Sequence, residues 1–317
     1  MTPLTEILRA EITRSGPIPF RRFMDAALYH PEYGYYRRHR EVFGKGGDFF
    51  TASQLQPVFG ILIALRIRSL RSEMGDPEDF TVVELGAGRG DMAEALSEFR
   101  YVPVDLDRGA LPGGFRGVVF SNEFFDALPV DAIVMRRGVP RQMLVRWNGD
   151  RFVWIEGDDA GDAVRNYLHE FFPPLEEDQI VEVSFDTLAW IERIASSLQS
   201  GFVFTLDYGY TRSELRRFPR GTLMSYRAHR ADSDVLLDPG ERDITAHVCF
   251  AALERHGAQH DLTVIRRETL ARTLLDAGES DQFAAVLTGG QERAQQLKTL
   301  LFGMGETFTS LLQRKGR

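Results

Sequence analysis

A single stretch decides the expected fold: Phe80-Thr81-Val82-Val83-Glu84-Leu85-Gly86-Ala87-Gly88-Arg89-Gly90. Residues 80–85 form a short apolar run with β-branched side chains, which predicts a buried strand. The glycines that follow allow positive φ and let the main chain approach a ligand closely. Residues 91–99 have helical composition, so we expect a helix directly after the loop. A strand, a glycine loop and a helix in this order predict a nucleotide-type binding site.

Outward from this stretch, strands and helices alternate along the chain. Further strands are expected at 101–104, 117–121, 180–184, 201–206 and 262–265, and helices at 186–198 and 245–255. This alternation predicts an α/β fold with a Rossmann-like core, in which a mostly parallel sheet carries helices on both faces. Residues 307–313 are expected to close the edge of that sheet.

Two regions differ from the alternating core. Residues 1–75 indicate a helical N-terminal cap, because Leu4, Leu8 and Ile12 recur at helical spacing. Short alternating segments flank Asn148-Gly149, which is a strong hairpin signal. We therefore predict a cap over 1–75 and a core over 76–317, with an antiparallel β meander inserted at about 130–180.

The spacing of the glycines indicates which ligand the loop binds. In the dinucleotide fingerprint G-x-G-x-x-G, the third glycine lies three positions after the second, and the loop holds a pyrophosphate. Here Gly90 comes one residue early, and Glu84 lies two residues before Gly86. A carboxylate repels pyrophosphate but suits a ligand that carries an ammonium and a sulfonium, as S-adenosylmethionine does. The loop thus predicts an S-adenosylmethionine site, and a nicotinamide oxidoreductase is a distant alternative.

Acids follow the next two predicted strands. Asp105 lies 21 residues after Glu84, where nucleotide sites place the acid that binds the ribose hydroxyls, and Asp107 is the alternative. The strand after it ends in Ser121-Asn122-Glu123-Phe124-Phe125-Asp126. Ligands of open α/β sheets bind beyond the carboxyl ends of the strands, so these polar side chains are expected at the reaction site. Carboxylates there can hold or deprotonate a nitrogen nucleophile, although Asp126 could instead cap a helix.

Several motifs together resemble the MidA-like family of class I methyltransferases. They are Tyr33-Gly34-Tyr35-Tyr36, Gly47-Asp48-Phe49, 84–90, 122–129, Asp207-Tyr208-Gly209-Tyr210, Gly221-Thr222-Leu223, 226–230, Asp238-Pro239-Gly240-Glu241 and 243–248. The resemblance implies that Gly86, Gly88 and Gly90 face S-adenosylmethionine and that Gly47, Asp48 and Phe49 cover it. It also implies that Glu123, Asp126, Asp207 and His247 line the cleft. The sequence itself places His247 near the start of the helix expected at 245–255.

The same family includes a mitochondrial protein that methylates an arginine during assembly of complex I. The resemblance therefore implies an S-adenosylmethionine-dependent methyltransferase acting on a protein side-chain nitrogen, with arginine as the family precedent. Only residues 100–119 join the glycine-loop helix to the 122–129 motif, and relatives have a longer segment there. If a strand and helix are deleted, Asp105 is not the ribose ligand. A non-catalytic assembly factor is then the alternative, and a small-molecule methyltransferase is another.

Composition limits the remaining classes. The net charge is −8, from 38 basic and 46 acidic residues, which argues against nucleic acid as a partner. Cys249 is the single cysteine, and we find neither a signal segment nor a membrane-spanning run, so a cytoplasmic protein away from membranes is expected. His256 and His260 are four residues apart, but Gly257 is expected to interrupt the helix between them and no acid partner is evident, so no metal site is predicted. A protein substrate is expected, and a homodimer is left open.

Overall fold

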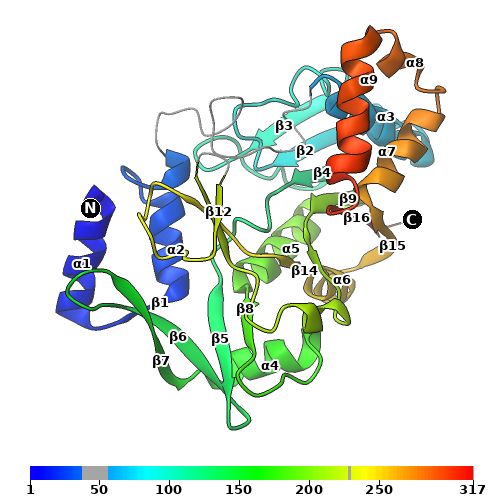
Figure 1. Ribbon diagram of the computed structural model, residues 1–317. Helices are drawn as coiled ribbons and strands as arrows, with labels where there is room; N and C mark the ends of the chain where they lie inside the picture. Colours follow the sequence, from blue (N-terminus) through cyan, green and yellow to red (C-terminus); the bar gives the residue numbers. More distant parts are fainter. Residues whose placement is uncertain (38–55, 228–229, 317) are drawn as a thin grey trace. The chain divides into compact units, whose positions relative to one another are not determined.

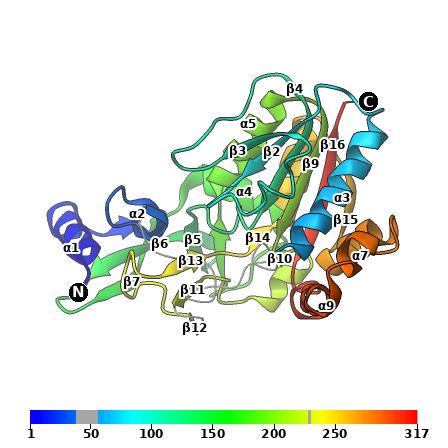
Figure 2. The ribbon, with the colours of Figure 1, turned by 90° about the horizontal axis from the view of Figure 1, so that it is seen from above.

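The computed structural model describes residues 1–37, 56–227 and 230–316, and it divides the chain into two compact units. The first, here called the meander unit, comprises Met1–Phe50, Asp126–Leu188 and Tyr210–Ala251. The second, the Rossmann-like unit, comprises Thr51–Phe125, Ala189–Gly209 and Ala252–Arg317. Figures 1 and 2 show the ribbon from two directions. The domain limits predicted at residues 75 and 130–180 differ from these divisions and stay predictions.

The Rossmann-like unit is built on a six-stranded sheet with the order β15-β16-β9-β4-β2-β3. Its strands are β2 (Thr81–Leu85), β3 (Arg100–Val104), β4 (Phe115–Asn122), β9 (Leu198–Asp207), β15 (Leu262–Thr269) and β16 (Thr309–Lys315). The four neighbours β3, β2, β4 and β9 run parallel, whereas β16 pairs antiparallel with β9 and with β15. The carboxyl ends of four parallel strands therefore meet at one edge of this sheet.

Helices cover both faces of that sheet. They are α3 (Val58–Glu73), most of α5 (Phe185–Ser197), most of α6 (Phe250–Gln259), α7 (Leu270–Glu279), α8 (Ala284–Leu287), α9 (Gly290–Thr299) and the π-helical η4 (Leu300–Met304). Phe202 and Phe204 of β9 point into one hydrophobic core with residues of α3 and α7. On the opposite face, Gln313 of β16 donates a hydrogen bond to the carbonyl of Leu253 in α6. Successive side chains along the strands thus contact a helical layer on each face of the sheet.

The meander unit holds the inserted antiparallel sheet and two smaller sheets. The inserted sheet consists of β1 (Ile18–Pro19), β5 (Asp131–Arg136), β6 (Val139–Trp147), β7 (Phe152–Asp159) and β8 (Ile180–Val183). The smaller sheets are β10 (Gly209–Tyr210) with β14 (Val248–Cys249), and β11 (Met224–Arg227) with β12 (Arg230–Asp232) and β13 (Asp243–Thr245). Strands β5, β6 and β7 pair antiparallel in succession, as the hairpin signals predicted. The helices are α1 (Pro3–Ser15), α2 (Phe20–Tyr29), η1 (Tyr35–Arg37), α4 (Gly161–Phe171) and η3 (Glu214–Arg217).

This architecture confirms the predicted α/β, Rossmann-like fold with a helical N-terminal region and an antiparallel meander. Leu4, Leu8 and Ile12 are all buried on α1, and Thr2 caps the helix by accepting a hydrogen bond from the N–H of Thr5. Within the described residues, no helix is long and apolar enough to cross a membrane.

Three expected elements differ from the structure. Residues 91–98 form consecutive turns rather than a helix, because most of their backbone hydrogen bonds run from residue i to i−3 and never become a continuous ladder. The helix expected at 245–255 begins only at Phe250. The β-branched residues Thr245 and Val248 favour strands, and they belong to β13, which pairs with β11, and to β14, which pairs with β10. The strand expected to close the sheet edge, β16, lies inside the sheet between β15 and β9.

Candidate active site

The glycine loop after β2 has a backbone that requires glycine. Gly86, Gly88 and Gly90 have φ values of 67°, 49° and 85°, which side chains of L residues rarely adopt. A Cβ at Gly86 would come 3.0 Å from the ring of Phe124, whereas one at Gly88 would meet no atom of the described residues closer than 4.0 Å. Among the described residues, the main chain at Gly88 is thus the less crowded of the two. The loop is shaped as predicted, although turns rather than a helix follow it.

Glu84 is a buried carboxylate at the end of β2. Its side chain is 6% exposed, and it accepts a hydrogen bond from the hydroxyl of Tyr101 on β3. Burial raises the pKa of Glu84 to about 7, against the lowering effects of the Tyr101 hydrogen bond and of Arg108. Tyr101 was not expected at the site. The parallel register pairs Glu84 with Pro103, so Tyr101 lies two residues away along the neighbouring strand, and only this pairing could have indicated it.

Asp105 follows β3, the strand directly beside β2. Its Oδ2 accepts a hydrogen bond of 2.5 Å from the N–H of Gly88, and its Oδ1 accepts one of 2.6 Å from the N–H of Leu106. The carboxylate therefore contacts the glycine loop, and its role as the ribose ligand stays a prediction. A carboxylate has about four lone-pair positions, so these two bonds leave acceptor capacity for ligand hydroxyls.

The end of β4 carries Asn122 and Glu123. The amide nitrogen of Asn122 donates to Oε1 of Glu123 at 3.1 Å, but its buried Oδ1 has no hydrogen-bond partner among the described residues. A buried acceptor of this kind is costly unless a ligand or water supplies a donor. Glu123 has φ = 52°, a left-handed conformation that is rare outside glycine and asparagine, and its N–H donates to the carbonyl of Leu206 at 3.0 Å. Local strain of this kind concentrates at functional sites.

Asp207 ends β9 and is fully buried. Its Oδ2 accepts from the N–H groups of Phe124 and Phe125 at 3.3 and 3.0 Å, and its Oδ1 accepts from the N–H of Tyr208 at 3.0 Å. These charge-assisted bonds fix the turn that directly follows Glu123. Asp207 therefore holds the main chain that follows β4 in place at the end of β9.

The meander unit holds the other two predicted catalytic residues. Asp126 is 3% exposed, and its carbonyl accepts a hydrogen bond from the N–H of Ala246 at 3.0 Å. His247 lies in the short segment between β13 and β14, not at a helix start. Its N–H donates to Thr222 Oγ1 at 2.9 Å, its ring packs edge-on against Phe218, and burial lowers its pKa. Burial therefore favours the neutral form of the imidazole.

The Rossmann-like unit thus brings together, at the carboxyl ends of adjacent strands, most of the predicted residues: Glu84, Gly86, Gly88, Gly90, Asp105, Asn122, Glu123 and Asp207. Asp126 and His247 belong to the meander unit. The predicted covering loop, Gly47, Asp48 and Phe49, lies outside the described residues.

A family model described as S-adenosyl-L-methionine-dependent methyltransferase matches residues 99–267, more than half of the chain. The chain belongs to this family. Its fold is also that of a Burkholderia thailandensis superfamily member crystallised with S-adenosyl-homocysteine, with a TM-score of 0.87 and 29% identity over 98% of this chain and 92% of that one. The protein is therefore a methyltransferase that uses S-adenosylmethionine as its methyl donor.

Two curated relatives carry a more specific name. The Drosophila melanogaster protein arginine methyltransferase NDUFAF7 homolog is 27% identical over 81% of this methyltransferase and 70% of the relative. The human protein arginine methyltransferase NDUFAF7 is 26% identical over 86% and 74%, respectively. Both are named as mitochondrial proteins, and this finding corrects the cytoplasmic location expected from the sequence. The homodimer stays a prediction.

Proposed function

We propose that this methyltransferase modifies a guanidinium nitrogen of an arginine side chain in a protein. The names of the Drosophila and human relatives support this substrate class. The observation that carries the proposal is Glu123, a half-buried acid in a strained conformation directly after β4, the strand that pairs with β2. Carboxylates match the planar, positively charged guanidinium in geometry and charge.

The residues present fit S-adenosylmethionine. We assign the glycine loop, Glu84, Asp105 and Asn122 to its binding. Gly88 leaves room for close approach of a ligand to the main chain, and the unpartnered Oδ1 of Asn122 can accept a hydrogen bond from an ammonium group. When bound, S-adenosylmethionine supplies an electrophilic methyl group on a sulfonium. The ionised form of Glu84 provides a matching negative charge, although burial favours its neutral form when no cation is near.

Glu123 is the residue proposed to act on the substrate. A guanidinium has a pKa above about 12, so a base must accept an N–H proton when the nitrogen gains a methyl group. Glu123 is half-buried and lies in a strained conformation directly after β4. It can hold the guanidinium by a charge-assisted hydrogen bond and then accept that proton. Asp207 is proposed to position the turn, because its oxygens already accept three backbone N–H groups.

The test uses purified full-length protein, S-adenosylmethionine with an isotopically labelled methyl group, and extract from cells that lack this protein. We expect label on arginine guanidinium groups of one or a few proteins, located by mass spectrometry of peptides. The test variant is Glu123→Gln, which keeps the size of the side chain but cannot accept the proton. Incorporation of label should therefore fall by about 10²-fold or more relative to the unchanged protein. Label on lysine, or only on small molecules, would contradict the arginine assignment.

A further inference from the structure

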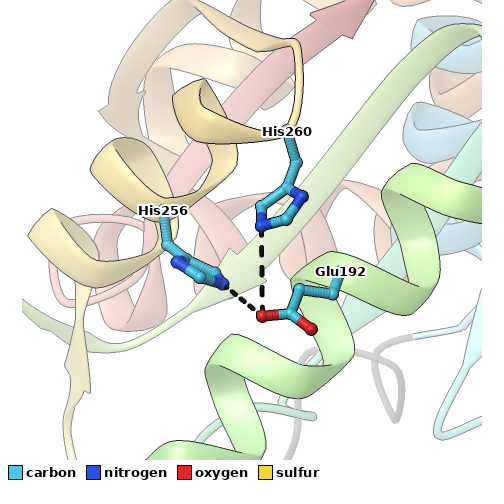
Figure 3. Close-up of side chains that lie close together, drawn as sticks. All are labelled: Glu192, His256 and His260. Carbon is cyan, nitrogen blue, oxygen red and sulfur yellow. Dashed lines mark hydrogen bonds and ion pairs between the residues drawn. The ribbon is translucent and has the colours of Figure 1, made fainter.

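A cluster of three side chains lies between helices α5 and α6 in the Rossmann-like unit. Glu192 comes from α5, His256 from α6, and His260 from the residue that directly follows α6. Oε1 of Glu192 is 3.1 Å from Nε2 of His256 and 3.9 Å from Nε2 of His260. Figure 3 shows both imidazole rings directed toward the carboxylate. The three candidate ligand atoms all lie within 4.8 Å of one another.

The local sequence brings the two histidines to the same side of the carboxyl-terminal end of α6, with their ring centroids 4.8 Å apart. Residues four apart on a helix are neighbours on its surface, and Gly257 does not interrupt the helix as the sequence suggested, because α6 continues to Gln259. A residue without a side chain is needed at Gly257 for a different reason, because a Cβ there would come 2.4 Å from Nε2 of Gln313. Glycine therefore lets α6 pack closely on β16. The acid that the sequence seemed to lack lies 64 residues before His256, on α5.

We propose that Glu192, His256 and His260 bind a divalent transition-metal ion, with zinc as the best match. Two imidazole nitrogens and one carboxylate oxygen are a recurrent ligand set for zinc, and a water can take the fourth position. Ligand atoms around a tetrahedral zinc ion with bonds of about 2.1 Å lie about 3.4 Å apart. The observed separations of 3.1 and 3.9 Å bracket that value.

The side chains have the freedom that closure on an ion requires. Those of Glu192 and His260 are 53% and 36% exposed, so both can rotate by the small amount needed, whereas that of His256 is 12% exposed and held by packing. An exposed contact between one carboxylate and imidazole rings gains little stability by itself. A bound ion would replace this weak contact with three coordinate bonds and would link α5 to α6.

The ion is expected to stabilise the fold rather than to take part in methyl transfer. Trp190 of α5 packs edge-on against Phe124, which adjoins the glycine loop. Glu192 is two residues further along, which turns its side chain about 200° around the helix axis from Trp190. The metal cluster and the contact with Phe124 therefore lie on opposite sides of α5.

The test is titration of zinc chloride into full-length protein whose purification tag has been cleaved and whose metal has been removed by a chelator. Calorimetry should give one zinc ion per chain, and zinc should raise Tm in a way that excess chelator reverses. Cobalt(II) should give the visible absorption of a nitrogen- and oxygen-coordinated ion. We expect Glu192→Gln and His256→Gln each to weaken zinc binding at least about tenfold, because changes even to the partners of metal ligands cost that much.

The matched control is His169→Gln, which removes an exposed histidine of α4 in the other unit. It should bind zinc as the unchanged protein does. Circular dichroism of each metal-free variant establishes that it is folded. Because Glu192 is exposed, Glu192→Gln is expected to fold as the unchanged protein does. The proposal is overturned if the protein shows no zinc binding, or if Glu192→Gln and His256→Gln bind as tightly as His169→Gln.

Discussion

Replacing Asp207 with asparagine tests whether the turn after Glu123 depends on a buried carboxylate. Asp207 is 0% exposed and accepts N–H groups on both oxygens, from Phe124 and Phe125 on one and from Tyr208 on the other. Asparagine has one oxygen and one NH2 group, so at least one backbone N–H would face a donor. Losing charge assistance and leaving a donor unpaired should lower the free energy of unfolding by about 2–4 kcal/mol.

Urea unfolding followed by circular dichroism measures that change. The matched control is Asp150→Asn, the same substitution in an exposed turn between β6 and β7, where we expect a change within about 0.5 kcal/mol. Because Asp207 positions Glu123 without being proposed to touch the substrate, Asp207→Asn should also reduce methyl transfer in protein that is still folded. An unfolding free energy equal to that of the control would refute the reasoning about the three N–H groups.

Three further predictions follow from the same site. Gly86→Val should abolish binding of S-adenosylhomocysteine in calorimetry, because the valine side chain would contact Phe124 and a φ of 67° is strained for valine. Undiminished heat of binding would contradict this. Burial raises the pKa of Glu84 from 4.5 to about 7, so the stability associated with its neutral form is complete below pH 4.5 and is lost as the pH rises to about 7. Between pH 4.5 and pH 7, the free energy of unfolding of Glu84→Gln, measured in urea, should rise relative to that of the wild type by on the order of 3 kcal/mol. A difference that does not change with pH would contradict this. Glu123→Asn should stay within about 1 kcal/mol of the wild type in stability, because asparagine tolerates positive φ, yet lose methyl transfer; a large loss of stability would show that Glu123 is chiefly structural.

The sequence sufficed for the main elements of the sheet because their signals are local. Residues 80–85 are a continuous β-branched and apolar run, and the Asn148-Gly149 pair marks the hairpin between β6 and β7. The glycine loop was also predictable, since its three positive φ angles demand residues without side chains.

Features that depend on distant pairing were beyond the reach of the sequence. The hydrogen bond from Tyr101 to Glu84 requires the register of β3 on β2, and the approach of Glu192 to His256 requires α5 to pack beside α6. The turns at 91–98 have the composition of a helix, and only their hydrogen bonds show otherwise. His247 lies between two strands of three and two residues, β13 and β14, which are too short to give a periodic pattern in the sequence.

The central claim is that the ends of β2, β3 and β4 bind the methyl donor, and a crystal structure with S-adenosylhomocysteine tests it most directly. We predict density for the ligand along Gly86–Gly90, with a ligand donor within hydrogen-bond distance of Asn122 Oδ1 and the ribose hydroxyls at Asp105. Ligand bound elsewhere, or strand ends without density in crystals grown at saturating ligand, would contradict the account.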